Sequence, residues 1–572
     1  MNDTRNMILA VVLSALVLLG WSALSDRFMP TAGPQTQRVE NGKVKPLPQP
    51  QADPAADAPR ALRSRAAVLT STPRVRIETP SLRGSINLQG ARIDDLSLVR
   101  HTQGVGANSP PIRLLSPAGA PGAFFASFGW LGQGVAAPDA NSVWQASSDR
   151  LTPGKPVTLA WTNPTGQRFQ QVISVDDGYL FTVRQSAGNA GAGPVALRPY
   201  GLVGRSSKSA DVSSWTHHVG PMAFLNGAAN YDLDWEDLDE AGAAGRSFSS
   251  NGGWLGFTDK YWLTALAPAT QASLNASFRR SPTGGYQADY AREPVIIAPG
   301  QAVTSESRFF AGAKEKEWLD RYETQGITKL SKSIDWGWFE WFMRPIFALL
   351  LWLFHTLGNF GLAIIGLVVI VRALMYPIFD KQFRSMAAMR VLQPKMKDIQ
   401  ERHKDDKVRL QQEMLDLYKR EKVNPAAGCL PILLQIPVFY ALYKVLTVSV
   451  EMRHQPFYLW IKDLSAPDPM TPVNLFGLLP FTPPGFLAIG VLPILLGITM
   501  WLQFKLNPTP PDPVQKQIFG IMPWVMMFIM APFAAGLQLY WVVSNILGIA
   551  QQKYLYWKYD TERQAAKPAA AR

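Results

Sequence analysis

Six long apolar runs constrain this 572-residue chain more than any other feature of its sequence. They lie at Met7–Leu24 and near 359–378, 429–450, 486–504, 518–534 and 536–557. About 20 apolar residues in a helix cross the hydrocarbon core of a bilayer, where every backbone amide must be hydrogen-bonded within the protein. The runs therefore predict six transmembrane helices. For the first run a cleaved signal peptide is the alternative, although the run is long for one and its cleavage site is weak.

The positive charge of the chain sits beside these runs and indicates their orientation. Twelve Lys or Arg residues lie in 380–422, and the loop 505–517 and the tail 558–572 are also basic. Because cytoplasmic loops of membrane proteins are enriched in Lys and Arg, we expect these segments and the N-terminus to be cytoplasmic. The long polar region 72–320 then lies in the periplasm, and the chain is a multi-pass inner-membrane protein. The formal net charge of +13 fits this topology and gives no reason to expect DNA as a partner.

Between the N-terminal anchor, 1–28, and the later runs lie a linker and a β-rich region. Residues 29–71 are rich in Pro, Ala and Gln and show no apolar period, which predicts a disordered periplasmic linker. In 72–320, short alternating stretches such as Arg74–Glu78 (RVRIE) are broken by Gly, Pro, Asn and Asp. This pattern predicts an all-β sandwich domain. After it, the aromatic-rich segment 332–357 predicts an amphipathic helix in the membrane interface, with a full span as the alternative.

Neither the β-rich region nor the apolar runs contain a pattern typical of catalysis. His217 and His218 are adjacent, so on a strand they would face opposite sides of the sheet, which disfavours a shared metal ion. Cys429 is the one cysteine, which excludes an intrachain disulfide, and no histidine near it in the sequence would activate it as a nucleophile. The sequence has no glycine-rich phosphate loop with a lysine. We therefore expect no enzyme activity, no metal and no cofactor.

Arg372 is the most informative polar residue, because it lies inside the run 359–378. Placing an arginine within a membrane span costs roughly 2.5–3.5 kcal/mol. None of the six runs contains Asp or Glu, so the guanidinium must be met by water, polar groups, lipid head groups or an arriving ligand. Gln435, Ser544 and Asn545 lie at similar depths in two other runs, and together these residues indicate a hydrated pocket open to the cytoplasm. Snorkelling of Arg372 to the interface and helix packing by the other side chains are the alternatives.

The basic segment 380–422 carries two apolar stripes. Helical spacing is followed by Met389, Leu392, Met396 and Ile399, and again by Leu410, Met414 and Leu417. A polar stretch separates the stripes, so the segment predicts two amphipathic helices folded back as a cytoplasmic hairpin. A charged arm that projects from a membrane protein is a natural contact surface for a partner. The alternative is a hairpin that serves only its own packing.

Several motifs of the chain resemble those of the YidC family of membrane protein insertases. They are Arg372 with Met375–Pro377 (MYP), Leu392–Lys395 (LQPK), Lys422–Pro431 (KVNPAAGCLP), Gln435–Pro437 (QIP), Phe457–Ser465 (FYLWIKDLS) and Gly536–Trp541 (GLQLYW). The similarity runs over nearly the whole chain, in the order anchor, β domain and five-span core, 358–557. It is most specific over 334–557 and looser in the β-rich region, where Gly252–Trp254 (GGW) and Asp259–Trp262 (DKYW) contribute.

The resemblance implies a mechanism. Members of the family use a hydrophilic groove that opens to the cytoplasm and the lipid and contains an arginine, which by position is Arg372. The candidate substrate-contact groove comprises Arg372, Gln435, Tyr540, Trp541, Ser544 and Asn545. Where the family commonly has a Tyr-Tyr pair, this chain has Tyr540 and Trp541. The groove takes in the short polar tail of a nascent membrane protein, whose apolar helix then leaves along the third and fifth spans. No ATP or other cofactor is implied.

The implied partners are nascent membrane proteins, the Sec translocon with its accessory subunits, and the lipid bilayer. The ribosome is a further implied partner of the hairpin and the tail. A membrane transporter or channel is the alternative function. It would predict internal repeats of the spans and acidic residues within them, and the sequence shows neither. A passive scaffold is the third possibility, and it would tolerate the loss of Arg372.

Overall fold

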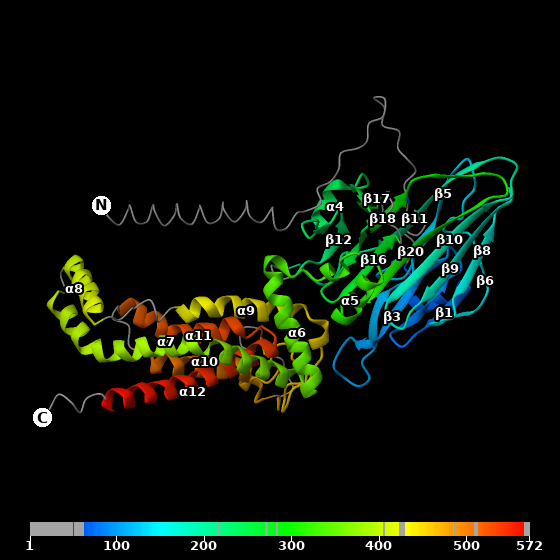
Figure 1. Ribbon diagram of the computed structural model, residues 1–572. Coiled ribbons are helices and arrows are strands. Elements are labelled where there is room, and N and C mark those ends of the chain that lie inside the picture. The colour runs from blue at the N-terminus through cyan, green and yellow to red at the C-terminus, as the bar shows by residue number, and fades with distance from the viewer. Residues whose placement is uncertain are drawn as a thin grey trace. The chain divides into compact units, whose positions relative to one another are not determined.

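The computed structural model describes residues 50, 62–213, 217–268, 273–281, 284–403, 406–421, 430–476, 478, 479, 481, 483, 484, 488–507 and 513–565 (Figure 1). The chain divides into two compact units, and the boundary falls between Trp338 and Phe339. The predicted anchor at 1–28, most of the linker 29–71 and the end of the tail lie outside the described residues. We call the two units the β unit and the helical unit.

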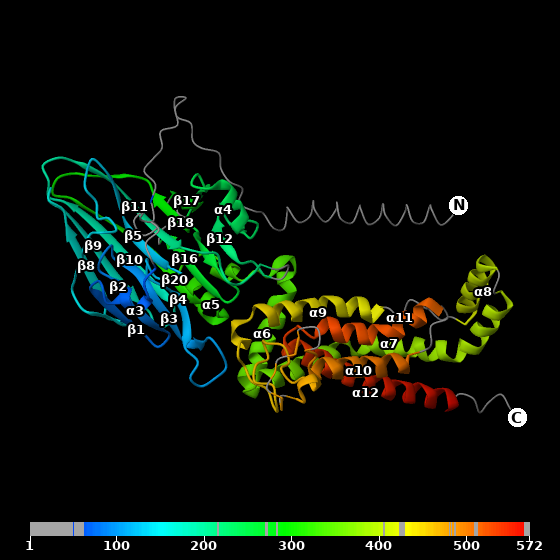
Figure 2. The ribbon, with the colours of Figure 1, turned by 180° about the vertical axis from the view of Figure 1, so that it is seen from behind.

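Two β-sheets make up most of the β unit (Figures 1 and 2). The strands of the larger sheet are β1 (Arg74–Glu78), β2 (Leu82–Asn87), β3 (Arg92–Thr102), β4 (Pro111–Leu115), β5 (Phe124–Gln133), β7 (Arg150–Leu151), β11 (Val195–Arg205), β14 (Arg246–Asn251), β17 (Ser273–Arg280), β18 (Tyr286–Arg292) and β19 (Val295–Ile297). Their order among the described residues is β14-β17-β18-β11-β5-β3-β2-β1-β7, with β19 beside β11 and β4 beside β3.

The smaller sheet is formed by the remaining strands. They are β6 (Gln145–Ala146), β8 (Val157–Thr162), β9 (Gln167–Val175), β10 (Leu180–Asn189), β12 (Gly220–Leu225), β13 (Ala228–Asn230), β15 (Trp254–Thr258), β16 (Trp262–Pro268) and β20 (Ala302–Ala313). Their order among the described residues is β13-β12-β15-β16-β20-β10-β9-β8-β6. Strands β10 and β20 pair antiparallel although they lie far apart in the sequence, so distant parts of the chain meet in this sheet.

An aromatic core joins the two sheets face to face. Phe128 of β5 and Phe309 of β20 have ring centroids 6.2 Å apart, and Gln171 of β9 donates a 2.7 Å hydrogen bond to the carbonyl of Phe128. Burial alternates along β9, because successive side chains of a strand point to opposite faces. The prediction of a β-rich region built from alternating strands is therefore confirmed.

Among the described residues, the β unit also has three short α-helices: α3 (Arg65–Leu69), α4 (Trp235–Ala241) and α5 (Lys316–Thr324). The first of these lies inside 29–71, so the expected disorder does not hold there. Ser64 caps α3 by accepting from the amide of Ala67, Val68 is buried, and Arg65 pairs with Asp95 of β3. The cap, the burial of Val68 and the long-range pair with Asp95 offset the weak local preference of so short a helix.

The helical unit contains α6 (Glu340–Leu357), α7 (Phe360–Arg402), α8 (Lys407–Arg420), α9 (Leu430–Val448), α10 (Val491–Leu506), α11 (Pro513–Met530) and α12 (Ala535–Ala565). Gly358, in the left-handed conformation at φ 69°, ends α6, and the side chain of Asn359 caps α7 by accepting from the amide of Leu362. The long helix α12 packs against both α7 and α10. The predicted helical C-terminal region is thus confirmed (Figure 1).

Among the described residues, Phe360–Met389 is the one stretch long and apolar enough to cross a bilayer. Shorter apolar helices cover Gln435–Val448, Val491–Leu506 and Lys516–Met530. The count of six spans therefore stays a prediction. The helix α7 also continues from the predicted span 359–378 into the first arm of the predicted hairpin, without a break.

Candidate functional site

Arg372 of α7 is half-buried, and its guanidinium is directed at α12. Nη1 donates to Oε1 of Gln551 (3.1 Å), and Nη2 donates to the backbone carbonyl and to Oγ of Ser544, the latter at 3.1 Å. The guanidinium also lies 5.5 Å from the ring centroid of Phe379. Nε is buried and has no partner among the described residues. The arginine is thus partly satisfied by neutral acceptors, and its Nε–H is left without one.

Helical spacing explains how α12 meets Arg372. Ser544, Gly548 and Gln551 lie at i, i+4 and i+7, so they share one face of the helix. A Cβ atom at Gly548 would lie 2.9 Å from Nη2 of Arg372, which is too close for a methyl group. Glycine at this position therefore makes room for the guanidinium between the serine and the glutamine.

Gln435 and Tyr540 form a second connection, between α9 and α12. Nε2 of Gln435 donates a 2.6 Å hydrogen bond to the hydroxyl of Tyr540, which is 2% exposed. The next residue, Trp541, packs its ring 4.6 Å from that of Phe439 on α9. Four residues separate Tyr540 from Ser544, so the tyrosine continues the face of α12 that meets Arg372.

Asn545 points to a different neighbour. Its Nδ2 donates to Oγ1 of Thr499 on α10 (3.1 Å), and both side chains are buried. Further along α12, Gln552 donates to Oδ1 of Asn507 (2.8 Å). These contacts pack α12 against α10, because buried polar side chains in an apolar surrounding need partners. Asn545 therefore does not join Arg372 in the structure, whereas Ser544 does.

Three further residues with chemical interest were missed by sequence reasoning. Gln551 and Gly548 follow Ser544 at helical spacing, and a search for residues on the same face would have found them. Lys444, 1% exposed, is a second cation within an apolar run, visible in the sequence as a lysine inside 429–450. Buried cations of this kind are rare in membrane helices and usually mark function or a specific partner.

Asp468, in the loop between α9 and α10, organises the other end of the helical unit. It is 6% exposed and accepts from the indole of Trp460 (2.9 Å) and from the amide of Leu492 in the first turn of α10 (2.7 Å). The same loop holds α12, because the amide of Gly536 donates to the carbonyl of Leu464 (2.8 Å). A carboxylate at a helix N-terminus is electrostatically favourable, so this loop fixes the starts of two helices.

Comparison with known proteins identifies both units. The family model described as the YidC periplasmic domain matches residues 74–349, and the model described as the 60Kd inner membrane protein matches 352–562. Together these matches cover most of the chain, and they meet close to the boundary between the β unit and the helical unit.

Named relatives extend the match along the whole chain. A membrane protein insertase YidC of Zymomonas mobilis subsp. mobilis is 49% identical over 567 residues, covering 98% of this chain and 97% of the relative. One from Methylorubrum extorquens is 44% identical, covering 96% and 94%. A crystal structure titled as an active YidC insertase with its first transmembrane domain resolved covers 95% of this chain and 99% of its own, at 15% identity and a TM-score of 0.38. On the family models and the full-length relatives, this chain belongs to the YidC family of membrane protein insertases.

Proposed function

We propose that the chain inserts apolar segments of other proteins into the inner membrane through a hydrophilic groove around Arg372. The groove would comprise the face of α12 that carries Tyr540 and Ser544, together with Gln435 of α9. Asn545 contributes indirectly, by fixing α12 against α10 through Thr499. No catalytic group or cofactor takes part in this proposal.

The proposal rests on the hydrogen-bond partners of Arg372. A guanidinium within an apolar helix is costly unless it is satisfied, and its described partners are all neutral. A carboxylate on the tail of a substrate would form charge-assisted hydrogen bonds with it, which are stronger than those to Ser544 and Gln551. Arg372 therefore favours substrates whose translocated tail is acidic.

Exposed apolar side chains on α9 and α11 support an exit route for the substrate along these two helices. The exposed apolar side chains of α11 are Ile518, Phe519, Ile521, Met522, Trp524, Val525, Phe528 and Ile529, and Ile436 of α9 is 56% exposed. A helix with large apolar side chains exposed around it requires lipid or another apolar helix as its surrounding. Transfer of the substrate helix into lipid yields about 25 cal/mol per Å² of apolar surface, which drives the step without ATP.

Topology and partners complete the proposal. We propose six spans, with the termini and the hairpin 380–422 in the cytoplasm and the β unit in the periplasm. The hairpin, formed by the end of α7 and by α8, is basic and carries exposed apolar residues such as Val408 and Leu415. Such a surface suits a contact with the ribosome, and the Sec translocon is a second partner of the membrane region.

A substrate series with acidic, neutral or basic translocated tails tests the role of charge. Arg372→Lys keeps the charge and should retain most insertion, although it loses the planar donor geometry of arginine. Arg372→Ala should lower insertion of the acidic-tail substrate about tenfold, the factor that corresponds to 1.4 kcal/mol. Arg372→Glu should insert the basic-tail substrate better than the acidic one. Insertion is measured at matched levels of the full-length chain.

Arg344 supplies the matched control. It is also an arginine of the helical unit, but Glu340 pairs with it one turn earlier on α6 (3.3 Å). Arg344→Ala should leave the dependence on tail charge unchanged. Equal insertion of the whole series by wild type and Arg372→Ala would refute the attraction by charge, and loss of all substrates alike would indicate a structural role for Arg372.

A further inference from the structure

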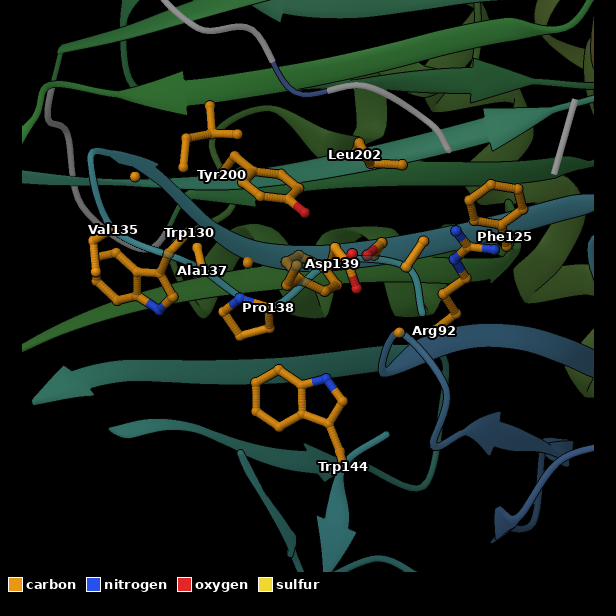
Figure 3. Close-up of a pocket in the computed structure, with 17 residues that line it drawn as sticks. Arg92, Phe125, Trp130, Val135, Ala137, Pro138, Asp139, Trp144, Tyr200 and Leu202 are labelled. Atoms are coloured by element: carbon orange, nitrogen blue, oxygen red, sulfur yellow. The ribbon is translucent and has the colours of Figure 1, made fainter. Parts of the chain in front are cut away.

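A cavity of about 410 Å³ lies on the larger sheet of the β unit (Figure 3). Its floor is formed by the neighbouring strands β5 and β11, where Gly129 stands opposite Tyr200 and Ser127 opposite Leu202. Phe128 of β5 contacts the smaller sheet, so its neighbours Ser127 and Gly129 face the opposite side, where the cavity lies. The volume is at the small end of the range for ligand pockets.

A loop held in place by hydrogen bonds forms one wall of the cavity. The amide of Gly90 donates to the carbonyl of Ser142 (2.9 Å), and the amide of Trp144 donates to the carbonyl of Leu88 (2.9 Å). Asp139 accepts from the amide of Ser142 (2.9 Å), which fixes the turn that carries its carboxylate into the lining. The cavity is therefore preformed, because its wall does not depend on a ligand for its hydrogen bonds.

Aromatic side chains surround the cavity. Figure 3 shows Trp130 and Trp144 on two sides, with the ring of Tyr200 above and its hydroxyl directed toward the middle. Trp130 and Trp144 are 2% and 3% exposed. Gly129 allows this placement, because a Cβ there would lie 2.9 Å from the hydroxyl of Tyr200. Flat apolar surfaces of this kind favour a flat ligand ring.

Polar groups in the lining define what kind of ring fits. The hydroxyl of Tyr200 is directed toward the middle of the cavity, where it can donate a hydrogen bond to a ligand or accept one. Arg92 is 8% exposed, and its guanidinium is ordered 4.8 Å over the ring of Phe125. Asp139 brings a carboxylate of opposite charge, so the cavity carries no excess of either sign.

We propose that this cavity binds a hexopyranose unit of a saccharide. The C–H faces of such a ring stack on Trp144 and Tyr200, and its hydroxyls, each a donor and an acceptor, hydrogen-bond with Arg92, Asp139 and the hydroxyl of Tyr200. A charged ligand would leave one of the two opposite charges unpaired, and a lipid chain would leave all the polar groups unsatisfied.

The test uses the full-length chain in lauryldimethylamine oxide, because maltoside detergents carry the proposed ligand themselves. Methyl glucoside, methyl galactoside and N-acetylglucosamine are titrated, with saturation-transfer NMR and tryptophan fluorescence as readouts. At least one sugar should bind saturably. Tyr200→Phe, which removes a single oxygen, and Trp144→Phe should each weaken binding about tenfold.

Trp161→Phe is the matched control, since Trp161 lies on β8 of the smaller sheet and packs against Phe169. It should bind sugar as the wild type does. The proposal is overturned if no sugar binds saturably, if Tyr200→Phe binds like wild type, or if Trp161→Phe loses binding equally. Saturable binding of a trialanine or triproline peptide in place of sugar would also overturn it. Should Trp144→Phe fail to fold, Tyr200→Phe decides alone.

Discussion

Arg372 donates a 3.1 Å hydrogen bond to Gln551 across a separation of 179 residues in the sequence. The arginine belongs to α7 and the glutamine to α12, so this contact joins two helices that are far apart in the sequence. In this hydrogen bond the donor, Arg372, is charged and the acceptor, Gln551, is neutral. An acidic group can therefore replace the glutamine at Arg372 and gain the full strength of a charge-assisted hydrogen bond.

Gly548→Ala tests whether the position of the guanidinium matters. The added methyl would lie 2.9 Å from Nη2 of Arg372, so the guanidinium must move away from Ser544. The displaced group is the far end of a flexible side chain, so stability should change little, whereas insertion of acidic-tail substrates should fall. Gly520→Ala on α11 is the control, because nothing lies within 4 Å of its added methyl. Equal insertion by the two variants would contradict the prediction.

Gln551→Leu tests the neutral acceptor itself. Leucine keeps the approximate size but removes the oxygen that accepts from Arg372, which leaves a half-buried guanidinium with one partner fewer. A lost hydrogen bond to a charged group costs about 1.5–3 kcal/mol, so thermal stability of the helical unit should fall. Addition of a substrate with an acidic tail should recover more stability in Gln551→Leu than in wild type. Identical recovery in both proteins would argue against a shared site.

Lys314 should make the stability of the β unit depend on pH in the alkaline range. Its ammonium donates to Oγ1 of Thr258 (3.0 Å) and to the carbonyl of Asp259 (2.8 Å), and burial lowers the pKa of Lys314 to about 8. Between this value and 10.5 the unfolded chain holds a proton that the folded chain has released. The free energy of unfolding therefore rises with pH in this window, by up to about 1.4 kcal/mol per pH unit.

Urea unfolding at several pH values between these limits measures the effect. Lys314→Met removes the titrating group, so the difference in slope between wild type and variant isolates it from other groups. A slope that is the same in both proteins would show that Lys314 titrates normally in the folded β unit.

The β unit should fold without the membrane spans. Its two sheets share an aromatic core, and the chain's one cysteine, Cys429, lies outside it, so no disulfide is lost on expression alone. A fragment of residues 62–338 should show β-type circular dichroism and one cooperative unfolding transition. Loss of near-ultraviolet signal with retained secondary structure would indicate instead that packing requires the helical unit.

The hairpin should be reached only from the cytoplasm. Gln412 on α8 is exposed, so Gln412→Cys in a Cys429→Ser background offers a single reactive thiol. A membrane-impermeant maleimide should label it in inverted vesicles and leave it unlabelled in intact spheroplasts. Labelling in spheroplasts would reverse the proposed orientation of the spans.

Local patterns in the sequence determined the kind of structure in each part of the chain. The alternation in stretches such as Arg74–Glu78 predicted strands, and the uniform apolar runs after residue 358 predicted helices, because side-chain burial repeats with the geometry of each element. The lone arginine in 359–378 marked the candidate site, since a charge in an apolar run is costly wherever the helix packs.

Only the tertiary structure decided which side chains meet. Ser544 and Asn545 are neighbours in sequence, yet the first contacts Arg372 on α7 and the second contacts Thr499 on α10. A uniformly apolar run does not encode the rotation of its helix, so these directions depend on packing against partners far away in the sequence. The saccharide cavity has the same origin: Tyr200 stands opposite Gly129 only because β11 pairs with β5 in this register, which a strand pattern alone does not specify.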